Sequence, residues 1–112
     1  MKDMLIECFP LYRNDSKIFT GYDEEQEKRV IGKYNLGKVN PMEPDLRLYY
    51  SGEEDKDFLS LWLKTSATGR PYLIGNRNGS SYVGLINLNR LEASDPYLTI
   101  YIVIKLNKEC KN

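Results

Sequence analysis

Aromatic and cationic side chains are interleaved in the middle of the chain, where together they could hold a ligand. The stretch 58–91 contains no carboxylate, whereas residues 1–57 hold 13 acidic and 9 basic side chains. On β surfaces, single-stranded nucleic acid is held by rings that stack on bases and cations that pair with phosphates. Tyrosine is also enriched in protein interfaces. The candidate binding residues are Trp62, Lys64, Arg70, Tyr72, Arg77 and Tyr82.

Some of these residues also have a purely structural interpretation. A single Trp on a strand, such as Trp62, commonly packs in a core. The polar stretch 76–81 could form a backbone nest for an anion, but such a sequence also makes an ordinary turn. The sequence leaves both interpretations open.

A second candidate surface is the acidic stretch 23–27. It lacks the glycine-centred spacing of a calcium loop. It could mimic the phosphates of a nucleic acid, although a solvated acidic face is the simpler interpretation. The residues of this candidate acidic face are Asp23, Glu24, Glu25 and Glu27.

Histidine, which many hydrolytic and metal-dependent sites use, is missing from the sequence. This removes Ser–His and Cys–His pairs and imidazole ligands. Pro44-Asp45 followed by Glu54-x-Lys56 resembles the signature of metal-dependent nucleases, in which carboxylates hold a divalent ion. Glu54, however, falls in a charged stretch that we expect to be a hairpin loop. We therefore expect a protein that is not an enzyme and uses no cofactor or metal.

The composition is that of one small domain, 1–112, with 16 acidic and 16 basic residues. Zero net charge argues against a protein that lives on duplex DNA. No apolar run reaches the length of a membrane span, and charge interrupts the start too early for a signal peptide. We expect a protein of the host cytosol without a membrane partner, in which Cys8 is a core residue and Cys110 a tail thiol.

Short alternating segments predict a mainly β fold. In 97–106 the even-numbered residues form a core face, and in 46–50 Leu46, Leu48 and Tyr50 do the same. In 58–64 three leucines face the core, which leaves Trp62 half exposed on the other face. The stretch 23–29 is either a helical turn or a solvated loop. The predicted strands are 4–12, 18–22, 30–36, 46–50, 58–64, 70–74, 82–88 and 97–106.

This pattern predicts a single antiparallel sandwich or small barrel of six to eight short strands, with at most one short helix. A proline in the first strand, Pro10, should mark an edge or a bulge, since it donates no hydrogen bond to a ladder. The polar stretch 75–81 is predicted to be a turn. An exposed tyrosine face on the last strand, or an edge at Pro10, would allow a homodimer.

The central stretch resembles a known family. Pro44-Asp45 precedes Trp62-x-Lys64-Thr-Ser-x-x-Gly-Arg70-x-Tyr72-Leu, and this pattern over residues 38–75 resembles a family of small plasmid- and phage-borne proteins of unknown function. The resemblance implies a small β protein of a mobile element. It carries no catalytic residues to this chain.

Together these features lead to two main functional expectations. The first is a small binding protein of phage or mobile-element origin that blocks a host defence system or host enzyme through a protein interface, as anti-CRISPR proteins do. The alternative is a small β-barrel that binds single-stranded nucleic acid. A virion structural subunit is a third possibility.

Overall fold

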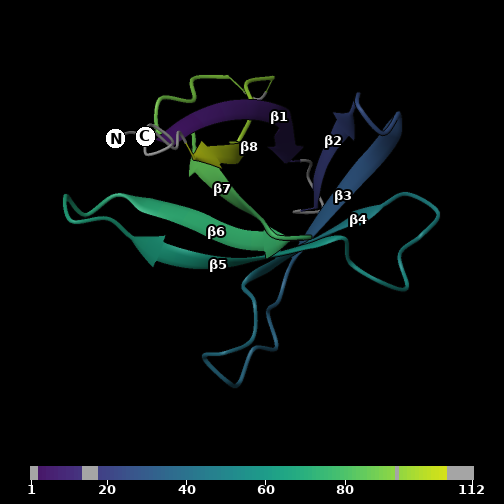
Figure 1. The fold of residues 1–112 in the computed structure, drawn as a ribbon, viewed down its shortest axis with the longest axis horizontal. Helices are drawn as coiled ribbons and strands as arrows, with labels where there is room; N and C mark the ends of the chain where they lie inside the picture. The colour runs from purple at the N-terminus through teal and green to yellow at the C-terminus, as the bar shows by residue number, and fades with distance from the viewer. Residues whose placement is uncertain (1–2, 14–17, 93, 106–112) are drawn as a thin grey trace, which may run out of the picture.

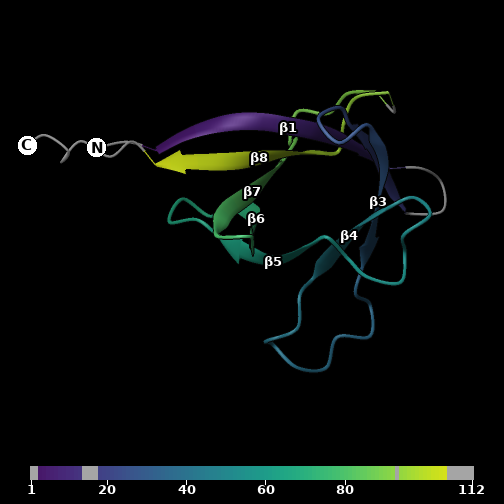
Figure 2. The same ribbon diagram turned by 45° about the vertical axis from the view of Figure 1, so that its right-hand side comes forward.

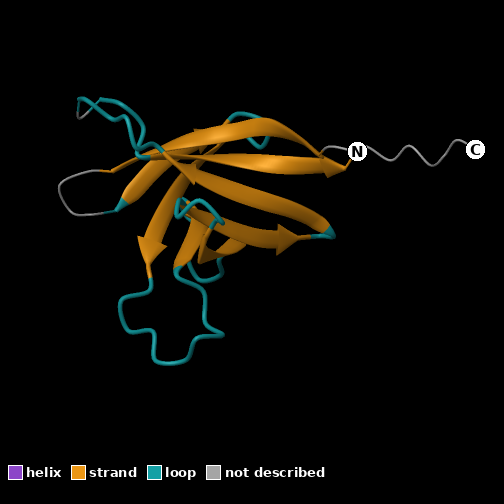
Figure 3. Cartoon of the chain, turned by 90° about the vertical axis from the view of Figure 1, so that its left-hand side faces the viewer, coloured by secondary structure: helices purple, strands orange, loops and turns teal. Residues whose placement is uncertain are grey.

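The computed structural model describes residues 3–13, 18–92 and 94–105, which form a closed barrel of eight antiparallel strands (Figure 1). Each strand pairs with its neighbour in sequence, and the last strand returns to the first. The described residues contain no helix (Figure 3). The strands are β1 (Asp3–Arg13), β2 (Phe19–Asp23), β3 (Lys28–Tyr34), β4 (Leu46–Tyr50), β5 (Leu59–Thr65), β6 (Pro71–Arg77), β7 (Ser80–Ile86) and β8 (Leu98–Lys105).

The predicted core faces are largely confirmed, although Ile104, predicted for the core face of the last strand, is 37% exposed. Alternate residues of each strand point into the barrel. The buried hydrophobic residues are Phe9, Leu11, Phe19, Val30, Leu46, Leu48, Tyr50, Leu59, Leu61, Leu73, Leu98 and Ile100.

The prediction for the third leucine of β5 is wrong. Leu63 is 50% exposed, although it shares a face with the buried Leu59 and Leu61. The ladder between β4 and β5 ends at Leu61, whereas β5 continues beside β6 as far as Thr65. The end of this hairpin therefore projects beyond the barrel wall that would cover Leu63 (Figure 1).

The polar stretch 75–81 is mostly strand, which corrects the predicted turn. Only Asn78 and Gly79 form the connection, and both have positive φ, 53° and 82°. Two such residues make the two-residue turn that matches the twist of a hairpin. Arg77 and Ser80 pair across the ladder, so β6 is longer than predicted, and β7 begins and ends two residues earlier than predicted. The stretch 23–29 is likewise no helical turn, because β3 already begins at Lys28.

The seam between β1 and β2 is short. β1 pairs with β8 from Asp3 to Leu11 but with β2 only at Tyr12 and Arg13. The β1–β8 ladder shifts register between Glu7 and Phe9, whereas Pro10 itself pairs regularly with Thr99, so the bulge lies at Cys8 and not at Pro10. β1 and β8 run side by side as a long ribbon that extends past the other strands (Figure 2).

The connections gather at the two ends of the barrel. One end carries the short connections 24–27 and 78–79 and the longer 51–58. The other carries 66–70, 87–97 and the long loop 35–45, which hangs below the strands in Figures 2 and 3. The predicted tail thiol Cys110 and the last residue of the predicted final strand, Leu106, lie outside the described residues.

Candidate functional site

The six candidate binding residues do not form one site, because strand alternation places them on opposite sides of the barrel wall. Lys64 and Tyr72 are cross-strand partners on the outer face of β5 and β6, and Trp62 shares that face. Arg77 and Tyr82 point inward, toward the end that carries connection 24–27. Arg70 lies exposed in the β5–β6 turn.

Two of the outer residues, Trp62 and Lys64, border a groove of about 800 Å³, which Tyr82 also lines. We call it the Trp62 groove. Its floor is the outer face of β5 to β8 and the start of β1, and the tip of loop 35–45 forms one wall. Asp3, Lys64, Asn76 and Ser81 supply polar groups around an apolar centre. The apolar and aromatic residues that line the Trp62 groove are Leu5, Pro41, Met42, Trp62, Ile74, Tyr82, Val83 and Val103.

Hydrogen bonds hold loop 35–45 against β5. The Trp62 indole N–H donates to the Met42 carbonyl oxygen at 3.0 Å. The Asp45 carboxylate accepts the backbone N–H of Leu63 at 2.8 Å and pairs with the Lys38 ammonium at 2.9 Å. The hydrogen bond from Leu63 is the main reason that the pKa of Asp45 is lowered. Trp62 is half-buried as predicted, since the loop covers part of its ring.

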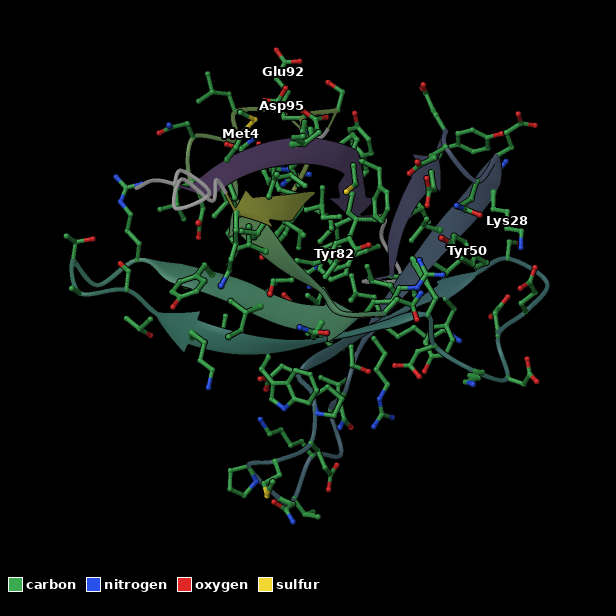
Figure 4. The ribbon with its side chains drawn as sticks, in the orientation of Figure 1. Met4, Lys28, Tyr50, Tyr82, Glu92 and Asp95 are labelled. Atoms are coloured by element: carbon green, nitrogen blue, oxygen red, sulfur yellow. The ribbon has the colours of Figure 1, made fainter. Side chains whose placement is uncertain are left out.

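The inner group borders a second cavity of about 650 Å³ at one end of the barrel. We call it the mouth cavity. Its floor is apolar, with Leu59 and Ile100. Tyr50 and Tyr82, from β4 and β7, contribute aromatic rings to it (Figure 4). Its charged lining residues are Glu7, Asp23, Glu24, Glu25 and Arg77.

Asp23 belongs to the interior of the mouth cavity, which corrects its assignment to an exposed acidic face. It is only 9% exposed. One carboxylate oxygen accepts the Tyr50 hydroxyl at 2.9 Å, and the other accepts the backbone N–H groups of Glu25 and Gln26. Burial, and then the hydrogen bond to Asp23, raise the pKa of Tyr50 to about 12. The exposed acidic face consists of Glu24, Glu25 and Glu27.

The mouth cavity has an electronegative interior. The Arg77 guanidinium lies 5.2 Å from the centre of the Phe58 ring and takes no part in the ion pairs found among the described residues. Burial raises the pKa of the Cys8 thiol, and the negative charges of Asp23, Glu25 and Glu7 raise it further. The four acidic lining residues outnumber the single cation, Arg77.

The sequence reasoning missed Cys8, Tyr50 and Phe58 as lining residues of the mouth cavity. The alternation in 46–50 does show that Tyr50 points inward. Which strands meet at the barrel end, however, depends on the strand order and on the bulge beside Cys8.

One of the two tyrosines of the last predicted strand, Tyr97, packs within the chain. Tyr97 precedes β8 and packs against Phe19, with ring centres 5.3 Å apart. Arg13 lies over the Tyr97 ring at 5.3 Å from its centre. Tyr97 is therefore engaged within the chain, whereas Tyr101 lies half-buried opposite Val83, and a homodimer through this strand stays a prediction.

The nuclease-like pattern is not assembled into a site. Asp45 and Glu54 flank opposite ends of β4, and Glu54 pairs with Lys33 at 3.5 Å. No group of three or more potential metal-ligating side chains gathers within residues 3–13, 18–92 and 94–105. No helix in this part of the chain is long and apolar enough to cross a membrane.

Comparison with protein families, curated proteins and solved structures finds no match to this chain. The resemblance of 38–75 to small plasmid- and phage-borne proteins therefore stays a prediction. The function is therefore inferred from the geometry of the Trp62 groove and of the mouth cavity.

Proposed function

We propose that this chain is a non-enzymatic binding protein that contacts another protein through the Trp62 groove. One observation carries the proposal. Trp62 is opposite Ile74, and Ile74 is opposite Val83, so three apolar side chains form a continuous row across the outer face of β5, β6 and β7. A strand face that meets only water normally carries polar residues at such positions.

Further apolar residues lie beside this row on the β1–β8 ribbon. Val103 is opposite Leu5 in the adjoining ladder, and Leu5 is 44% exposed. Ile74 is 38% exposed. A contiguous apolar patch with a polar rim is typical of a protein interaction site. Trp62 supplies the kind of large, half-buried ring that anchors such contacts.

The partner proposed for this surface is a host protein, which the chain would inhibit by occupying its surface. An origin in a phage or mobile element and action in the host cytosol belong to the same proposal. The absence of histidine and the separation of Asp45 from Glu54 support binding rather than catalysis. If the groove instead contacts a second copy of this chain, light scattering would detect the homodimer.

Affinity capture from a host lysate tests the proposal. The wild-type chain should retain one stoichiometric partner, and the variant Ile74→Asp should lose it, because a charge then lies in the centre of the apolar row. Equal capture by both proteins, or no stoichiometric partner, would count against this function.

Single-stranded nucleic acid is a second candidate ligand for the same face. Lys64 lies opposite Tyr72, next to Trp62, so a cation and two rings lie on adjacent strands. Binding of this kind weakens steeply with salt and quenches tryptophan fluorescence. An oligonucleotide that leaves Trp62 fluorescence unchanged at low salt removes this candidate.

A further inference from the structure

The first half of β1 presents a free strand edge. Residues Asp3–Phe9 have ladder partners in β8, and among the described residues they have none on the other side. Met4 and Ile6 are each 47% exposed on this segment. Figure 2 shows β1 along the outside of the sheet, with β8 beside it. An edge of this kind offers its backbone N–H and C=O groups to a further strand.

The free edge lies at the entrance of the mouth cavity. Residues 6–9 of β1 line the cavity on one side of the seam, and residues 23–26 line it on the other. A Cβ on Gly21 would lie 2.5 Å from the Pro10 carbonyl oxygen, so β2 closes the seam at that point. A strand added to Asp3–Phe9 would therefore lie across the entrance, and its alternate side chains would point into the cavity.

The charges around this entrance select the side chain that would enter. Glu7, Glu24 and Glu25 stand exposed at the rim, and both carboxylate oxygens of Asp23 already accept hydrogen bonds. Arg77 is the only cation among the lining residues, and its guanidinium lies over Phe58. The cavity thus carries a net negative charge. Aromatic rings such as that of Tyr82 also favour a cation.

We propose that an extended segment of a partner protein adds to the free edge of β1 as a strand and places a lysine or arginine side chain in the mouth cavity. A second copy of this chain fits the edge poorly. Two antiparallel β1 edges centred on Leu5 would place Asp3 opposite Glu7 of the other copy, and like charges in that position repel. This site is centred on the mouth cavity, although Asp3 and Leu5 of the edge and Tyr82 of the cavity also line the Trp62 groove.

Selection of displayed random peptides against the full chain tests the proposal. The recovered peptides should contain a lysine or arginine flanked by β-branched residues. Fluorescein-labelled copies of these peptides provide the affinity measurement. N-methylation of alternate amides should lower the affinity about tenfold, because each blocked N–H removes a ladder hydrogen bond. Replacing the basic residue by norleucine should lower it by a similar factor.

Matched variants locate the binding surface. Glu7→Gln combined with Glu25→Gln should weaken binding severalfold, and the exposed positions of both side chains leave the fold intact. Glu92→Gln is the control, since Glu92 is exposed in the connection 87–97 at the other end of the barrel (Figure 4). Ile74→Asp should bind the peptides as the wild type does, which separates this site from the Trp62 groove.

Several results would overturn the proposal. These are a selection that enriches no peptide, enriched peptides without a basic residue, and binding that tolerates N-methylation at every position. Equal weakening by Glu92→Gln would show that the effect comes from overall charge and not from this entrance.

Discussion

The indole N–H of Trp62 donates to the backbone carbonyl oxygen of Met42 at 3.0 Å. This side chain of β5 therefore holds the tip of loop 35–45, which lies about twenty residues earlier in the chain. The same ring lines the groove whose wall that loop forms. The position of the wall therefore depends on Trp62 as well as on the ion pair between Lys38 and Asp45.

Replacing Trp62 by Phe should loosen loop 35–45 while leaving the barrel folded. The variant loses one hydrogen-bond donor and part of a ring, and Met42 is exposed enough for water to satisfy its carbonyl. We expect a loss of about 0.5–1.5 kcal/mol in the free energy of unfolding. Hydrogen exchange should accelerate in 35–45 and remain unchanged in β7 and β8. Unchanged exchange in the loop would show that Trp62 does not hold it.

Asp45→Asn should remove part of the acid sensitivity of the protein. The Asp45 carboxyl has a lowered pKa in the folded chain, chiefly because it accepts the Leu63 N–H. The ionised group therefore contributes stability above the unfolded pKa of about 3.9, and this contribution is lost as the pH falls through the lowered folded value.

Urea unfolding of the wild type and Asp45→Asn over an acidic pH series measures this effect. The amide still offers an oxygen to the Leu63 N–H, so the variant should fold. The stability difference between the two proteins should shrink as the pH falls. A difference that stays constant with pH would contradict the assignment.

Tyr50→Phe should change how the free energy of unfolding depends on pH in the alkaline range. Burial and Asp23 raise the pKa of Tyr50 from 10.0 to about 12, so the folded state keeps a proton that the unfolded state releases. This contribution is fully present below about pH 10 and is lost as the pH rises to about 12. The pKa values of Tyr34 and Tyr82 are also raised, so the comparison must be made between wild type and variant.

At neutral pH the same variant should be less stable by about 1–3 kcal/mol, because the buried Asp23 carboxylate loses the Tyr50 donor. Chemical unfolding at neutral and at alkaline pH gives both values. A Tyr50→Phe protein that is as stable as the wild type at neutral pH would exclude this hydrogen bond as a support of the barrel end.

Gly75→Ala should destabilise the barrel wall. A Cβ at Gly75 would overlap the backbone carbonyl oxygen of Ser60 in the adjoining strand, where no flexible side chain can yield. We expect a loss of about 1–3 kcal/mol. Gly37→Ala is the control, because a Cβ there meets no atom within 4 Å. Thermal unfolding should separate the two variants clearly, and equal midpoints would contradict the close approach of β5 and β6.

The fold class and much of the core could be predicted from alternation alone. Leu46, Leu48 and Tyr50 have the period that a half-buried strand requires, and Leu98 and Ile100 begin the same pattern in β8. A barrel rather than a sandwich could not be predicted, because the choice depends on β1 closing on β8 across almost the whole chain.

The candidate site was harder to predict, because register decides on which side of the wall a residue lies. Arg77 fell in a predicted turn, so no alternation could be assigned to it, and Tyr82 began a predicted strand whose core face was not assigned. With the two-residue turn at Asn78 and Gly79, the side chains of Arg77 and Tyr82 point into the barrel, whereas Trp62 points outward. Asp23 looked solvated among its acidic neighbours, and only its long-range contact with Tyr50 places it inside.

The central claim is that the Trp62 groove contacts a protein partner, and site-specific photocrosslinking tests that contact most directly. A photoreactive residue at Ile74 lies in the groove, whereas one at Leu88, which is 57% exposed in the connection 87–97, lies outside it. In a host lysate the Ile74 probe should give one dominant crosslinked protein, and the Leu88 probe should give none. Crosslinks of equal yield from both positions, or none from Ile74, would contradict the account.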